Sequence, residues 1–147
     1  MESTAGEETV SLSFSPRPEN VALARMLAGA LAGRWGMPRE SVDDVRLVVS
    51  EACTNAVRAQ HRSGSDAEIS LTCRLDGDFA VEISDHGCGD SILAHAGFPR
   101  PGSAESGYGI PLMRTIASEA TFVRNDSGGT TVRLVVERAG ESKDDAA

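Results

Sequence analysis

Five stretches of the chain read as β-strands. In ETVSLSFS the apolar residues Val10, Leu12 and Phe14 alternate with polar ones, a period typical of a strand with one buried face. The other four stretches are AEISLTCRL, DFAVEIS, TFVRN and TTVRLVVE. Turn-forming residues, Asp76-Gly77-Asp78 and Ser127-Gly128-Gly129, join these four stretches in pairs, which predicts two hairpins.

Two longer stretches carry apolar residues at helical spacing. The first runs from Glu19 to about Arg34 and the second over roughly residues 40–61, with Gly36 and Pro38 between them. Ile110 to Ser118 predicts a third, shorter helix. This order of elements favours an α+β two-layer sandwich, with helices on one face of a mostly antiparallel, mixed sheet.

The length of 147 residues fits one domain with its own core. We expect that domain to span residues 9–138, between disordered polar tails at 1–8 and 139–147. Residues 90–106 carry glycine, proline and serine without a clear period. A loop of that length in a compact domain is usually functional or disordered.

Charge and composition narrow the classes of function. The net charge of −8 argues against direct nucleic-acid binding, which needs a basic surface. The chain has no long apolar run typical of a membrane span, and its acidic N-terminus is unlike a signal peptide. The cysteines, Cys53, Cys73 and Cys88, are odd in number and widely separated, which favours reduced thiols. We therefore expect a cytoplasmic protein.

Asp85 is the first candidate site residue, because an aspartate follows an apolar strand with core parity. Phe79, Val81, Ile83 and Asp85 point to the same side of their strand, so the carboxylate should lie at the edge of the buried face. A buried carboxylate is costly unless hydrogen-bond donors face it, and the exocyclic amine of a ligand is one such donor. Gly87 and Gly89 would let the backbone approach a flat ligand, although an exposed turn is the alternative.

The second candidate pair lies on the second predicted helix. Glu51 and Asn55 are one turn apart and share a face displaced from the apolar stripe. The Asn55 amide oxygen suits a hard cation such as Mg²⁺, and the Glu51 carboxylate suits proton abstraction. A solvated helix face is the alternative.

Two glycine pairs complete the candidate site. Gly107 and Gly109 precede the third predicted helix, whose free N–H groups could bind phosphate oxygens; an ordinary helix entry is the alternative. Gly128 and Gly129 form the last hairpin turn, and the adjacent Thr130 is a candidate polar contact to a nucleotide.

Three boxes in this order resemble those of the GHKL (Bergerat-fold) ATPases. They are E-A-x-x-N-A at 51–56, D-x-G-x-G at 85–89 and G-x-G-I-x-L-M at 107–113. The resemblance covers the chain from about Val10 to Glu137. Within that superfamily, the short chain is most similar to bacterial anti-sigma factors that are also serine protein kinases.

The resemblance implies ATP and Mg²⁺ as cofactors and a role for each box. It implies that Asp85 accepts the adenine amino group, that Asn55 coordinates Mg²⁺ and that Glu51 is the catalytic base. The further nucleotide-binding residues that it implies are Gly87, Gly89, Gly107, Gly109, Ile110 and Thr130. The loop 90–106 would be the ATP lid.

The resemblance also implies partners. In that family Mg-ATP phosphorylates a serine of an anti-anti-sigma (STAS-type) protein, and the same kinase can instead hold a sigma factor inactive. Arg25 matches a position that the family uses at its partner surface, although a solvated helix charge is the alternative. A homodimer is implied as well.

Two functions stay open on the sequence. The first is an anti-sigma factor with Mg-ATP-dependent serine kinase activity. The second is a non-catalytic or weakly catalytic ATP-binding module that sequesters a sigma factor or another regulator. Glu105 and the lack of lysine in the expected lid favour the second, because an acidic residue beside a triphosphate repels it.

Overall fold

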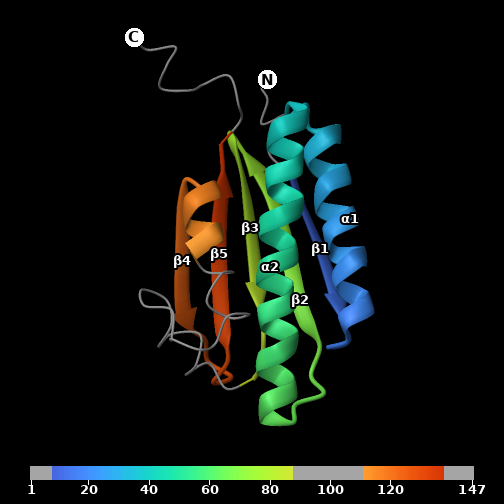
Figure 1. The fold of residues 1–147 in the computed structure, drawn as a ribbon, viewed down its shortest axis with the longest axis vertical. Helices are drawn as coiled ribbons and strands as arrows, with labels where there is room; N and C mark the ends of the chain where they lie inside the picture. The colour runs from blue at the N-terminus through green and yellow to red at the C-terminus, as the bar shows by residue number, and fades with distance from the viewer. Residues whose placement is uncertain (1–7, 88–110, 138–147) are drawn as a thin grey trace.

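The computed structural model describes residues 8–87 and 111–137 (Figure 1). The strands are β1 (Glu8–Phe14), β2 (Ile69–Asp76), β3 (Asp78–Ser84), β4 (Glu119–Arg124) and β5 (Thr130–Val136), and the two long helices are α1 (Pro18–Arg34) and α2 (Arg39–Ser63). Residues 111–116 form a further short helix. Each strand and long helix predicted from the pattern is therefore present.

The strands form one five-stranded sheet in the order β1-β2-β3-β5-β4. Each neighbouring pair of described strands is antiparallel, so the mixed pairing that we expected is not seen in this part of the chain. Figure 1 shows α1, α2 and the short helix on the same side of the sheet. The predicted α+β two-layer arrangement is confirmed.

The core lies between the sheet and the helices. In β2 buried residues alternate with more exposed ones, because one face of the strand meets the helices. Apolar side chains from the inner sheet face and from both long helices form one buried cluster, which includes Phe79, Leu134, Val45 and Ala28. This packing fixes α2 over the middle of the sheet, where it positions the candidate site.

Turn glycines place the ends of these elements. Gly64 ends α2 in the left-handed conformation, with φ of 75°, and its N–H bonds to the His61 carbonyl. Gly77 and Gly128 also have positive φ and form the two predicted hairpin turns. Both predicted hairpins are confirmed.

Two boundaries differ from the sequence prediction. β1 begins at Glu8, the first residue of the predicted strand ETVSLSFS, although the same residue was also expected to end the disordered tail. Its carboxylate accepts a hydrogen bond from Trp35 and faces Arg34 at 3.6 Å. α2 begins at Arg39 after Pro38, whereas Glu40 or Ser41 was expected near the start; no side chain caps it.

Cys53 and Cys73 are free and buried. Burial raises the pKa of each thiol to about 12, so neither reacts as a thiolate near neutral pH. No described helix has the length and apolar character needed to cross a membrane.

Candidate functional site

Asp85 lies directly after β3, on the buried side of the sheet. Phe79, Val81 and Ile83 are buried with the predicted parity, and Asp85 itself is 2% exposed. The prediction that its carboxylate lies at the edge of the core is confirmed, and the alternative of an exposed turn residue is wrong.

The backbone around Asp85 donates to one carboxylate oxygen. Oδ1 accepts hydrogen bonds from the N–H of Gly87 at 3.0 Å and of Thr130 at 3.2 Å. Burial raises the pKa of this carboxyl group, and these two bonds oppose that shift. We expected a ligand to satisfy the carboxylate, whereas the protein already satisfies Oδ1; within the described residues no hydrogen bond to Oδ2 is found.

Two glycines let other segments approach Asp85 closely. A Cβ on Gly87 would lie 2.5 Å from the carbonyl carbon and oxygen of Ala59, so only glycine lets this segment pack on α2. A Cβ on Gly129 would overlap the carbonyl of Asp85. We expected Gly87 to serve the approach of a ligand, but its nearest constraint is the backbone of α2.

Thr130 completes this end of the site. It is fully buried, its carbonyl accepts from the Asp85 N–H at 2.9 Å, and its hydroxyl has no hydrogen-bond partner among the described residues. A buried hydroxyl without a partner is costly, which marks it as a group suited to a ligand or a water.

Two further candidate residues, Glu51 and Asn55, lie on α2. Asn55 is 6% exposed and its amide nitrogen has no partner in the described part of the chain. Glu51, one turn earlier, is half-buried. A solvated helix face is therefore the wrong interpretation for Asn55. Its amide oxygen is a hard donor that fits Mg²⁺, an ion that usually keeps several waters.

No group of three or more His, Cys, Asp or Glu residues among those described could hold a metal by itself. A magnesium ion here would depend on oxygens of a nucleotide and on waters as well as on Asn55. In such a shared site the Asn55 amide oxygen would face the ion, and the amide nitrogen, which lacks a partner among the described residues, is suited to donate to an oxygen of the nucleotide.

Several predicted residues lie outside the described residues. These are Gly89, Gly107, Gly109, Ile110 and the expected lid at 90–106, with Glu105 in it. The structure therefore describes the part of the candidate site around Asp85 and the part on α2.

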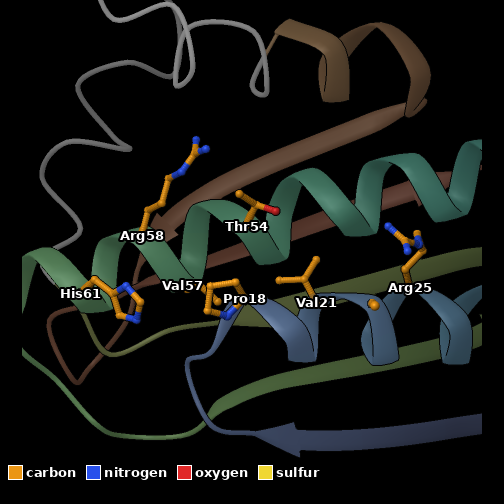
Figure 2. A pocket seen from close by; sticks show the side chains of 8 residues that line it. Pro18, Val21, Arg25, Thr54, Val57, Arg58 and His61 are labelled. Atoms are coloured by element: carbon orange, nitrogen blue, oxygen red, sulfur yellow. The ribbon is translucent and has the colours of Figure 1, made fainter.

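Arg25 lies on the outer face of the helical layer. Its guanidinium donates to the Ser50 hydroxyl at 3.2 Å, across from α1 to α2. It lines a cavity of about 340 Å³ between the two helices, together with Pro18, Val21, Ala22, Thr54, Val57, Arg58 and His61. Figure 2 shows Arg25 toward one end of this cavity and His61 toward the other.

Two residues that the sequence reasoning missed hold the Asp85 segment. Asn125 donates from Nδ2 to the Asp85 carbonyl at 3.0 Å, and its Oδ1 accepts from the N–H of Gly129. Gln60 is fully buried, and its Oε1 accepts from the N–H of His86 at 2.9 Å. A glutamine one turn after Ala56 in an apolar stripe was the signal that could have indicated Gln60.

The described residues thus form a two-layer α+β domain, with helices on one face of a five-stranded antiparallel sheet. A buried carboxylate, Asp85, lies at the end of the central strand of that sheet. Residues 14–136 match the histidine kinase-like ATPase domain, and the chain belongs to that family.

Curated relatives match over nearly their whole length. The chain is 31% identical over 130 residues to a protein named anti-sigma F factor from Halalkalibacterium halodurans, covering 85% of this chain and 89% of that one. It is 29% identical over 144 residues to the serine-protein kinase RsbW of Bacillus subtilis, covering 92% and 89%.

Solved structures share the fold. The SiaB-SiaC complex of Pseudomonas aeruginosa matches with a TM-score of 0.67 at 14% identity, over 85% of this chain and 88% of that one. The RsbU and RsbW domains of a Mycobacterium tuberculosis protein match with a TM-score of 0.63 at 18% identity, over 88% of this chain and 32% of that one. At these identities the likeness concerns the fold.

Proposed function

We propose that this protein binds Mg-ATP and phosphorylates a serine of an anti-anti-sigma partner, and that it alternatively holds a sigma factor inactive. The observation that carries the proposal is the buried Asp85 carboxylate, with one oxygen held by the backbone and the unpartnered Thr130 hydroxyl beside it. Membership of the ATPase family and the names of the relatives support it.

Asp85 would read the adenine base. The bonds from Gly87 and Thr130 fix Oδ1, which leaves Oδ2 to accept from an exocyclic amine. Guanine presents a carbonyl oxygen where adenine presents that amine, and a carboxylate would repel it. The Thr130 hydroxyl would supply a second polar contact, directly or through a water.

α2 would serve the phosphates and the acceptor. Asn55 would hold Mg²⁺, which when bound supplies charge neutralisation at the phosphate oxygens. Glu51 would accept the proton of the serine hydroxyl as that oxygen attacks the terminal phosphate. Gly87, Gly89, Gly107, Gly109 and Ile110 would line the nucleotide, as the resemblance implies.

The outer face of α1 would meet the partners. Arg25 is exposed and lies beside the cavity between α1 and α2, where a carboxylate of a partner could approach its guanidinium. The relatives named as anti-sigma factors support a sigma factor as one partner, and the relatives named as serine-protein kinases support a protein substrate. The homodimer stays a prediction.

The test is phosphate transfer from labelled Mg-ATP to a candidate anti-anti-sigma protein. Glu51→Gln should lower the transfer rate by about 10²- to 10⁴-fold, because it removes the general base. Its affinity for Mg-ATP should stay close to that of the unchanged protein. Glu40→Gln, an exposed change in the first turn of α2, is the matched control and should keep full transfer. Transfer that survives Glu51→Gln would contradict this mechanism.

The second candidate function is a module that binds ATP and sequesters a regulator without catalysis. In the described part of the chain no hydrogen bond or ion pair is found at Glu51, so no described neighbour fixes the orientation of its carboxylate towards an acceptor hydroxyl. Under this function Mg-ATP binds and changes the affinity for the regulator, but no phosphate reaches a serine. Calorimetric binding together with the transfer assay separates the two functions.

A further inference from the structure

Gln60 joins three segments of the chain from a fully buried position on α2. Its Nε2 donates to the carbonyl of Ala67 at 2.6 Å and to that of Ser65 at 3.4 Å, in the connection to β2. Its Oε1 accepts from the N–H of His86 at 2.9 Å, directly after Asp85. Both ends of the amide are therefore used, which is the condition for burying a polar group at low cost.

We propose that Gln60 is a positioning residue for base recognition, acting on Asp85 through the backbone of His86 and Gly87. The inference rests on the proposed function, because it assigns a task to Gln60 in the same nucleotide site. Gln60 touches neither nucleotide nor partner in this proposal.

The contacts lead from Gln60 to the carboxylate in two steps. First, Oε1 holds the N–H of His86, and the next residue, Gly87, packs against the backbone of Ala59 and Gln60 so closely that a Cβ would not fit. Second, the N–H of Gly87 donates to Asp85 Oδ1. If the bond to His86 is lost, the Gly87 segment can leave α2 and Oδ1 loses one of its two fixed donors.

α2 thereby links the two halves of the site. Asn55 lies five residues before Gln60 on the same helix, about 7–8 Å along its axis. A shift of the Asp85 segment away from α2 would change the place of the base relative to the group that holds Mg²⁺. In this proposal Gln60 thus fixes the distance between the group that binds the base, Asp85, and the group that binds Mg²⁺, Asn55.

The experiment compares the affinities for Mg-ATP and Mg-GTP by calorimetry in the full chain, at a temperature where each variant is folded by circular dichroism. Gln60→Met keeps the approximate size and removes both hydrogen-bonding groups. Val45→Ala, at the other end of α2 and equally buried, is the matched control for lost stability. The ratio of the two affinities is the readout, because a merely structural role lowers stability without changing which base is preferred.

We expect the ATP-over-GTP preference to fall about three- to tenfold in Gln60→Met, the effect of one lost hydrogen bond, and to stay unchanged in Val45→Ala. An unchanged ratio in Gln60→Met would overturn the inference while leaving the proposed function intact. A wild-type protein that binds neither nucleotide, or both equally, would overturn the proposed function itself.

A second measurement needs no variant. In the unchanged protein the His86 amide should exchange its hydrogen with solvent at least about tenfold more slowly than an unbonded exposed amide, since Gln60 Oε1 bonds it. Exchange at the rate of an unbonded amide would overturn the inference even if Gln60→Met does not fold.

Discussion

At the scale of single residues, Asp85 is a buried carboxylate that costs folding free energy and that the proposed function uses to bind a ligand. Its carboxylate is 2% exposed, and burial raises its pKa. Two backbone donors offset part of that cost at Oδ1. A group that is costly in the free protein and only partly satisfied is typical of a site that is completed by a ligand.

We predict that Asp85→Asn makes the folded protein more stable near pH 7, by about 1 kcal/mol, because it removes a buried charge and keeps an oxygen for both backbone donors. The folded-state pKa is raised, so the native protein holds this proton more tightly than the unfolded chain does. The stabilisation that this proton gives to the folded state is therefore fully present below the unfolded pKa of about 3.9. It is lost as pH rises through the folded-state pKa of Asp85.

The gain from Asp85→Asn should accordingly shrink as pH falls from about 7 to about 4, since the wild-type carboxyl then takes up its proton. Thermal unfolding of both proteins across this range measures the difference. A variant that is less stable than wild type at pH 7 would contradict the account of Asp85 as a desolvated charge.

Gly87 supports a second prediction at this scale. Gly87→Ala should destabilise the fold by about 2 kcal/mol and weaken ATP binding, because its Cβ meets the backbone of Ala59 at 2.5 Å. Gly33→Ala is the matched control: a Cβ there meets nothing within 4 Å, and α1 should gain about 0.5–1 kcal/mol. Denaturant unfolding checks both, and equal effects of the two changes would contradict the close packing described.

At the scale of elements, α2 carries most of the proposed chemistry on one helix. In the proposed function Glu51 and Asn55 serve the phosphates, and Ala59 and Gln60, four and five residues after Asn55, hold the Asp85 segment. The helix is rigid over this length, so it fixes the spacing between these groups.

We predict that Asn55→Ala removes most of the magnesium dependence of ATP binding. The change should alter stability little, by less than about 1 kcal/mol, since the amide nitrogen has no partner among the described residues. Titration of ATP with and without Mg²⁺ gives the measurement, and Thr54→Ala on the same helix is the control. An undiminished magnesium effect in Asn55→Ala would remove Asn55 from the metal site.

The elements themselves could be predicted from the sequence. Alternation in DFAVEIS and the helical stripe of the second helix are local patterns, and they gave β3 and α2 to within two residues at each end. Alternation in ETVSLSFS likewise predicted the start of β1 at Glu8, and only the expected tail, 1–8, overlapped it by this residue. The contacts of the Glu8 carboxylate with Trp35 and Arg34 could not be predicted, because those residues lie far along the chain.

At the scale of the whole molecule, the candidate site depends on the sheet order. β3 pairs with β5, and this pairing brings the residue after β3 next to the first residue of β5, although the two are 45 residues apart. The turn before β5 and the end of α2 then approach Asp85 from two further elements. The site therefore forms only when β3, β5, the turn before β5 and α2 come together.

This dependence explains what the sequence could and could not predict about the site. Asp85 was found because strand parity is local, and Thr130 because it follows a glycine turn. Gln60 and Asn125 were missed because their bonds to the Asp85 segment span 26 and 40 residues. A glutamine in an apolar helix stripe indicates that Gln60 has a buried partner, but not that this partner is His86.

The central claim is that the Asp85 carboxylate reads adenine. Calorimetric titration of the full chain with Mg-ATP and with Mg-GTP, in the wild type and in Asp85→Asn, tests it most directly. We predict that the wild type prefers Mg-ATP by about tenfold or more, and that Asp85→Asn stays folded and loses this preference. A wild type without the preference, or an Asp85→Asn variant that keeps it in full, would contradict the account.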